Sequence, residues 1–299
     1  MSFFYLSAII LGAVCGWVFP ASTAFSVCVM PLLAGLLLAT FVSVPRLDSS
    51  IFPAMPRRFL LALGIANGVI APSCAWLLTR LLAAENTLEQ AVSFGALLVL
   101  LTPCVDYVVV FAQKAGGNAA RLALVTPLLL VAQLMIVPII AGRSVDSMRL
   151  LSSVGMLIVV PLGAAWFIQR YLPSLVLPVS RAMDPLMVAV LWVIAASTVP
   201  LLSLPVSVFA LLALVFASFA TASGLCTFVL ASALKVEWTD RVNCTFSAMT
   251  RNSLVMMPLA LSFDNPVIPA VFVCQTFVEL VVLHATVGLF SRRSTESTT

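Results

Sequence analysis

The sequence predicts an all-α integral membrane protein with ten transmembrane helices in two inverted five-helix repeats. The first observation is composition: of 299 residues, 62% are hydrophobic and 9% charged, and the mean hydropathy is +1.18. Soluble domains carry about a quarter charged residues, so this chain has too few for a water-facing surface. The other two observations are the number of apolar runs and the distribution of basic residues between them.

Apolar runs bounded by charge, Pro or Gly recur along the whole chain, and each is long enough to be a candidate membrane helix. The first run lacks a basic leading segment and a cleavage site, so we interpret it as a membrane span and not as a signal peptide. The ten predicted spans are 3–20, 24–44, 58–82, 91–115, 119–141, 149–171, 185–202, 206–233, 240–262 and 267–290.

Lys and Arg residues are concentrated on one side of these spans. Eleven fall on one side, three (Arg80, Arg143 and Arg149) fall on the other, and Arg251 lies within a span. Because basic loops stay in the cytoplasm, both termini are predicted to be cytoplasmic in a multi-pass protein of the cell membrane. This orientation requires an even number of spans. The scattered basic residues, with a net charge of +4, make the lipid bilayer the expected partner and not nucleic acid.

The two halves of the chain, 1–146 and 147–299, resemble each other. Pro127 and Gln133 in the fifth span match Pro269 and Gln275 in the tenth at the same spacing. Five spans per half is an odd number, so the second half is predicted to be inverted relative to the first. The fourth and ninth spans are then counterparts.

Each of these counterpart spans contains a polar interruption: Thr102-Pro103-Cys104-Val105-Asp106 in the fourth and Thr250-Arg251-Asn252-Ser253 in the ninth. Thr102 and Thr250 are 148 residues apart. Pro103 is expected to break its helix, and Asn252 or Ser253 to cap the half-helix that follows. Polar, broken backbone at membrane depth is tolerated only inside protein or around a cavity. Half-helix N-termini at such breaks can bind anions and nearby carbonyl ends can bind cations, which is typical of secondary transporters.

Asp106 and Arg251 are the acid and the base nearest mid-depth in these two spans, and we expect them to pair. The pair is either a structural ion pair or a functional one, in which substrate competes for Arg251 and frees Asp106 to take up a proton. Cys104 lies inside the first break, where its thiol either suits a soft metal or metalloid or only fills a helix crossing.

Three further polar side chains are candidates for ion coupling: Gln133, Gln275 and Glu279. Glu279 lies one helical turn after Gln275 on the same face. Each either lines a cavity or hydrogen-bonds a neighbouring helix. Two other local predictions are close helix approach at Gly64 and Gly68, beside Asn67, and a tight turn at Gly116-Gly117-Asn118.

The run Thr102-Pro103-Cys104, followed by Gly116-Gly117-Asn118, Pro127 and Gln133, resembles the bile acid/sodium symporter superfamily, and in particular its arsenite-efflux permeases. This resemblance implies ten spans, of which 1, 2, 6 and 7 form a panel and 3–5 and 8–10 form a core with broken, crossing spans 4 and 9. It also implies that Cys104 takes part in transport.

The chain departs from the family pattern at two positions. Leu254 occupies the place of an acidic residue that serves cation coupling in the family, and Asp106 replaces a small neutral residue. These departures, together with the positive charge of Arg251, favour proton coupling or an anionic substrate over sodium coupling.

The first functional hypothesis is proton-coupled efflux of arsenite or antimonite, with Cys104, Arg251, Asn252, Thr102, Ser253 and Thr250 at the cargo site. The alternative is a sodium- or proton-coupled symporter of a small organic anion. A membrane-embedded sensor or scaffold that moves nothing is a third hypothesis. No enzymatic motif, cofactor or metal site is predicted, and the oligomeric state is not indicated.

Overall fold

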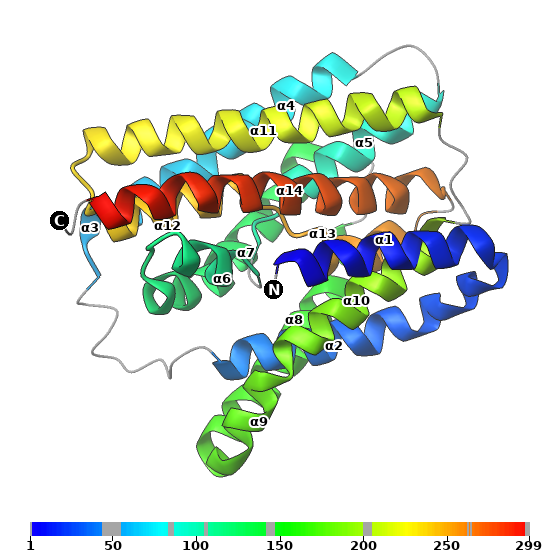
Figure 1. Cartoon of the computed structure of the whole chain (residues 1–299), viewed down its shortest axis with the longest axis horizontal. Coiled ribbons are helices and arrows are strands. Elements are labelled where there is room, and N and C mark those ends of the chain that lie inside the picture. Colours follow the sequence, from blue (N-terminus) through cyan, green and yellow to red (C-terminus); the bar gives the residue numbers. More distant parts are fainter. Residues whose placement is uncertain are drawn as a thin grey trace.

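The computed structural model describes residues 2–43, 55–82, 87–104, 107–141, 147–199, 205–261, 263 and 265–296 (Figure 1). Most of these residues are helical, and none of the described residues belongs to a β-strand longer than an isolated bridge. The all-helical prediction is therefore confirmed for this part of the chain.

The first half of the chain is a series of helices interrupted at proline and at polar residues. Pro20 stands at the start of a 3₁₀ turn directly after the first helix, where a residue that cannot donate a backbone hydrogen bond is tolerated. In order, the elements are α1 (Ser2–Val18), η1 (Pro20–Phe25), α2 (Ser26–Ser43), α3 (Arg57–Ile65), η2 (Ala66–Ile70), α4 (Ala71–Leu82), α5 (Thr87–Leu100), α6 (Tyr107–Lys114) and α7 (Ala119–Ala141).

The second half of the chain contains the two longest described helices, α11 and α14. Pro205 precedes its longest apolar helix, α11, and Lys235 with φ of 55° follows it, a left-handed conformation that commonly ends helices. The elements are α8 (Ser147–Tyr171), η4 (Pro173–Leu175), α9 (Val176–Arg181), α10 (Met183–Thr198), α11 (Val206–Ala233), α12 (Trp238–Met249), α13 (Ser253–Leu261) and α14 (Val267–Glu296).

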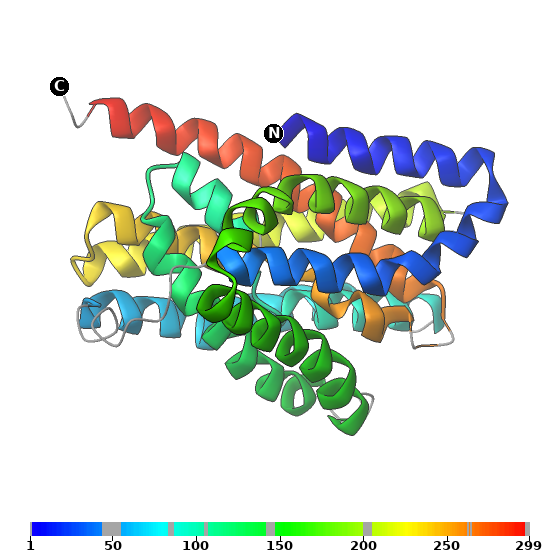
Figure 2. The same ribbon diagram turned by 90° about the horizontal axis from the view of Figure 1, so that it is seen from below.

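The helices pack in two groups. In one group, α1 lies along α10, and α2 contacts α8, α9 and α10. In the other, α11 packs on α12 and runs beside α14, which also contacts α5 and α13, while α4 lies between α5 and α11. Figures 1 and 2 show the two groups side by side, with α13 contacting α8 and α1 contacting α14 where the groups meet.

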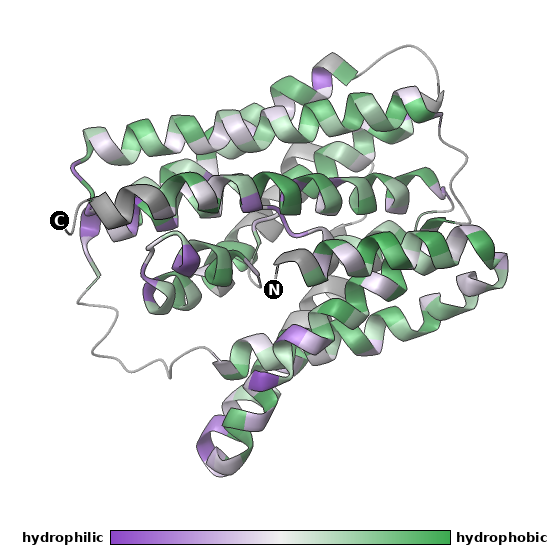
Figure 3. Ribbon diagram, viewed as in Figure 1, coloured by the Kyte–Doolittle hydropathy of each residue, from purple (hydrophilic) through white to green (hydrophobic). Residues whose placement is uncertain are grey.

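The helices are mostly hydrophobic along their length (Figure 3), and many of their large apolar side chains are exposed. Among these side chains, Trp17 is 80% exposed and Val206 is 84% exposed. The surface of a water-soluble protein rarely exposes so many large apolar side chains. Four described helical segments are long and apolar enough to cross a membrane, and a fifth is possible if α9 and α10, bent by 44°, act as one span. The chain thus has the helices of a multi-pass membrane protein.

The structure has fewer helices of spanning length than the ten predicted spans, because several predicted spans are divided by breaks. A span needs about 20 residues, and α5, α6, α12 and α13 have 14, 8, 12 and 9 residues because breaks divide them. Other helices, such as α7, run over residues whose side chains lie outside the described part. Length and composition alone do not identify such segments as spans.

The predicted close helix approach at Gly64 and Gly68 is wrong. A Cβ atom added at either glycine would meet nothing within 4 Å, because both glycines face outward. Asn67 between them is the buried residue. Its Nδ2 donates to the Leu63 carbonyl at 3.2 Å and to the Ser247 hydroxyl at 3.0 Å, so a polar bond and not a small-residue contact joins this helix to α12.

Close helix approach occurs instead at Gly12, where a Cβ atom would lie 2.4 Å from the carbonyl oxygen of Trp192 in α10. We predict that Gly12→Ala lowers stability by about 1–3 kcal/mol, because α1 and α10 must separate. Gly163→Ala is the matched control, since nothing lies within 4 Å of a Cβ added there. Thermal unfolding in detergent measures both, and equal midpoints for the two variants would contradict the prediction.

Candidate functional site

The two polar interruptions are real breaks, and they lie against each other. Helix α5 ends at Leu100 and α6 begins at Tyr107, while α12 ends at Met249 and α13 begins at Ser253. Pro103 and Arg251 form an isolated antiparallel bridge, and the Asn252 backbone N–H donates to the Thr102 carbonyl at 2.9 Å. The predicted breaks are therefore confirmed, and each satisfies backbone groups that the other frees.

Threonine hydroxyls bond the helix ends on both sides of this crossing. The Thr102 hydroxyl donates to the Val99 carbonyl at 3.1 Å, and the Thr250 hydroxyl donates to the Phe246 carbonyl at 2.9 Å. Each supplies a donor to a carbonyl in the last turn before the break. At both breaks, a threonine hydroxyl therefore hydrogen-bonds a carbonyl at the end of the helix that stops there.

The six residues predicted to form the cargo site are all buried at or beside the crossing. They are Thr102, Cys104, Thr250, Arg251, Asn252 and Ser253. The Ser253 hydroxyl, at the start of α13, contacts the Thr276 hydroxyl of α14, so it faces another helix.

Glu279 of α14 connects both breaks. Its Oε2 accepts the backbone N–H of Arg251 at 2.7 Å and also a bond from Gln275, while its Oε1 accepts the Tyr107 hydroxyl at 2.7 Å. The Tyr107 hydroxyl also lies 3.4 Å from the Arg251 carbonyl oxygen. Of the predicted ion-coupling candidates, Gln275 and Glu279 therefore lie at the crossing.

Tyr107, the first residue of α6, was not predicted to be a site residue. A tyrosine at the start of an apolar half-helix is typical of helix packing. The one signal in the sequence that could have indicated a role at the site is its position immediately after the first break. The backbone of Gln133 lies in α7, but its side chain lies outside the described residues, as does the whole of Asp106.

The Arg251 side chain extends toward α11. The residue is 0% exposed, its Nη2 donates to the Ala248 carbonyl at 2.6 Å, and the guanidinium lies 5.0 Å from the centroid of the Phe219 ring. Within the described residues Arg251 forms no ion pair, and its Nε and Nη1 have no hydrogen-bond partner. A buried charge of this kind is costly unless a counter-charge satisfies it. The predicted pairing with Asp106 stays a prediction.

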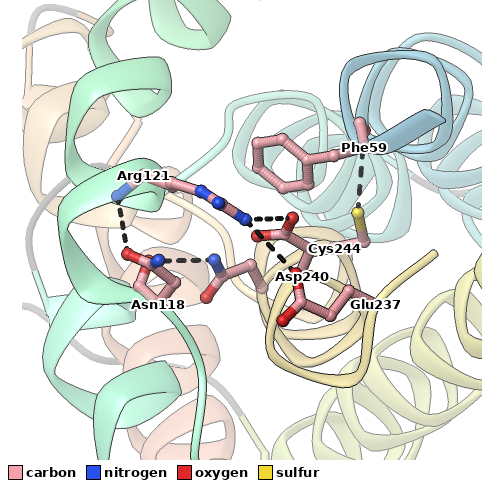
Figure 4. Close-up of polar contacts among 7 residues, drawn as sticks. Phe59, Asn118, Arg121, Glu237, Asp240 and Cys244 are labelled. Carbon is pink, nitrogen blue, oxygen red and sulfur yellow. Dashed lines mark hydrogen bonds and ion pairs between the residues drawn. The ribbon is translucent and has the colours of Figure 1, made fainter. Parts of the chain in front are cut away.

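A second polar cluster joins the turn after α6 to the start of α12 (Figure 4). Gly116, with φ of 89°, forms the predicted tight turn, and the Asn118 side chain caps α7 by accepting the Arg121 N–H at 3.1 Å. Arg121 Nη1 then bonds Asp240 Oδ2 at 2.7 Å and lies 3.6 Å from Glu237 Oε2. This cluster ties the start of α7 to α12, the helix before the second break.

No protein-family model matches the sequence, and none of the curated proteins compared with it matches. Function is therefore inferred from the geometry and chemistry of these residues.

The ion pair between Arg121 and Asp240 has a direct test. We predict that Arg121→Met costs roughly 1–3 kcal/mol, because it leaves a buried carboxylate without its donor. The Asp240 side chain is 1% exposed. Glu237→Gln is the control. The Glu237 side chain is 64% exposed, and the variant loses only its 3.6 Å ion pair with Arg121, so stability should fall by about 0–1 kcal/mol. Denaturant or thermal unfolding of the two purified variants measures the difference, and an equal loss in both would refute the prediction.

Proposed function

We propose that this chain is a secondary active transporter whose cargo binds where the two broken helices cross. The observation that carries the proposal is the backbone contact between Pro103 and Arg251, buried within a helical protein with an apolar surface. Paired breaks of this kind supply helix ends and free carbonyls to a ligand at membrane depth.

The architecture proposed for this transporter is ten spans in two inverted repeats, as in the bile acid/sodium symporter superfamily. Support comes from the helices, which follow the ten predicted ranges closely, and from the breaks, which recur 148 residues apart. In this proposal α1, α2, α8 and α10 form the panel, and the other helices form the core that carries the crossing. Both termini are then cytoplasmic.

The cargo proposed first is arsenite or antimonite, exported in exchange for protons. Cys104 supports it, because this buried thiol lies one residue after Pro103, at the contact between the breaks. Trivalent arsenic and antimony are soft and prefer sulfur ligands. The hydroxyl and amide groups of Thr102, Thr250, Asn252 and Ser253 suit the hydroxyl groups of the cargo. Motion of the core against the panel would expose the crossing to each side in turn.

Transport into everted membrane vesicles tests this cargo. We predict that vesicles containing the protein accumulate arsenite when a proton gradient is imposed, and that Cys104→Ser reduces the uptake at least tenfold. Cys28→Ser is the control, because Cys28 is exposed on α2, away from the crossing. Unchanged uptake by the Cys104 variant would show that the thiol does not bind the cargo.

A small organic anion is the second candidate cargo, and a separate observation favours it. The Arg251 guanidinium is buried with two nitrogen atoms that no described residue hydrogen-bonds. The oxygen of a carboxylate or sulfonate can accept a hydrogen bond from Nε or from Nη1, because a guanidinium binds such anions through charge-assisted hydrogen bonds. In this case Cys104 would only fill space at the crossing.

Replacing Arg251 distinguishes the two cargoes. We predict that Arg251→Met raises stability by about 1–4 kcal/mol, because an apolar side chain of similar length removes a buried charge that forms no ion pair with any described residue. If the cargo is anionic, the same variant loses the thermal stabilisation that organic anions give the unmodified protein, with or without sodium. The exposed Arg181 provides the control, Arg181→Met. Stabilisation by arsenite alone, kept in the Arg251 variant, would reject the organic anion.

A further inference from the structure

Three donors converge on the carboxylate of Glu279, and they come from three places in the chain. Tyr107 donates from the start of α6, the backbone of Arg251 donates from the second break, and Gln275 donates from one turn earlier in α14. The carboxylate is buried, so water cannot replace any of these donors. Such an arrangement fits an ionised carboxylate, which only accepts hydrogen bonds.

Adding a proton to this carboxylate creates a conflict, which a neighbour that can turn its donor away relieves. A protonated carboxyl oxygen carries a hydrogen, so a donor facing that oxygen must turn away. The Arg251 N–H is fixed by the backbone and faces Oε2. The Tyr107 hydroxyl faces Oε1 and can rotate about its C–O bond. It also has a second acceptor at hand, the Arg251 carbonyl oxygen 3.4 Å away.

We propose that Glu279 is the site that binds the coupling proton and that the Tyr107 hydroxyl is the switch that responds to it. The proton adds to Glu279 Oε1. The Tyr107 hydroxyl then rotates, accepts a hydrogen bond from the new carboxyl O–H and donates its own hydrogen to the Arg251 carbonyl. No covalent bond other than the O–H of Glu279 forms, and the proton leaves by the reverse steps.

Rotation of the Tyr107 hydroxyl changes the hydrogen-bond partner of α6. With Glu279 ionised, Tyr107 donates to α14; with Glu279 protonated, it donates to the backbone of the second break. The half-helix after the first break is thereby bonded directly to the second break only in the protonated state. Binding of a proton to Glu279 therefore changes the hydrogen bonds at the crossing of the two broken helices, where the cargo is proposed to bind.

Within the part of the chain that the structure describes, few other groups near Glu279 could hold the proton. The charged and titratable side chains that face it are Tyr107 from α6 and Arg251 from the break between α12 and α13, and Gln275 is the polar neighbour on its own helix. From the described residues of the other helices packed on α14, no further charged side chain acts on it. Among these described side chains, Glu279 is the carboxyl group, and we therefore assign the proton to it.

This inference rests on the proposed transport function, and it identifies the coupling ion and its site. The test is infrared difference spectroscopy of the purified full-length protein between high and low pH, which detects the carbonyl band of a protonated carboxyl group without any cargo. We expect a band that Glu279→Gln abolishes. The control, Glu237→Gln, removes an exposed carboxylate and should leave that band in place.

The switch has its own variant. Tyr107→Phe should keep the band but move it to higher frequency, because the buried carboxyl group loses its hydrogen-bond partner. Tyr171→Phe, at an exposed tyrosine, should not move it. If Glu279→Gln does not fold, Tyr107→Phe decides: a band unchanged in that variant overturns the proposal, as does a band that survives Glu279→Gln.

Transport measurements separate this inference from the proposed function. We expect Glu279→Gln to lose at least tenfold of proton-driven arsenite accumulation while still exchanging arsenite across the membrane, because a permanently neutral side chain cannot carry a proton. A Glu279-dependent band in a protein that moves no cargo would support the proton site and reject the proposed function. Proton-driven uptake without such a band would support the function and reject the proton site.

Discussion

The structure depends on the way two interrupted helices satisfy each other's backbone in an apolar interior. A helix that stops inside such an interior leaves N–H and C=O groups that neither water nor lipid can bond. Here the Asn252 N–H bonds the Thr102 carbonyl, and the Arg251 N–H bonds Glu279. Each break is therefore stable only because the other break and α14 are in place, which explains why the polar residues of distant segments converge on one point.

The same constraint orders the side chains around the crossing. Thr102 and Thr250 bond the ends of the helices that stop, Ser253 contacts α14, and Glu279 collects donors from both breaks. Arg121, near the start of α7, also forms an ion pair with Asp240, near the start of α12. The second broken span is thus held in two places, through the backbone at the crossing and through this ion pair near the start of α12.

The sequence predicted the helix ranges and both breaks, because proline and clustered polar residues in apolar segments have strong local consequences. It placed Gln275 and Glu279 among the ion-coupling candidates from their spacing on one helix face. It could not predict that the Arg251 side chain turns toward Phe219 on α11, because the direction of a long side chain depends on which helix lies beside it. For the same reason it missed Tyr107 and assigned helix contact to Gly64 and Gly68, although Asn67 makes that contact.

The direct hydrogen bond between the two breaks, from the Asn252 N–H to the Thr102 carbonyl, joins main-chain groups, and this has an evolutionary consequence. Peptide groups are the same whatever side chain they carry, so substitutions at Cys104 or Asn252 can leave the junction intact. A lineage can then exchange one transported compound for another by changing a few side chains, without having to reinvent the framework that presents them.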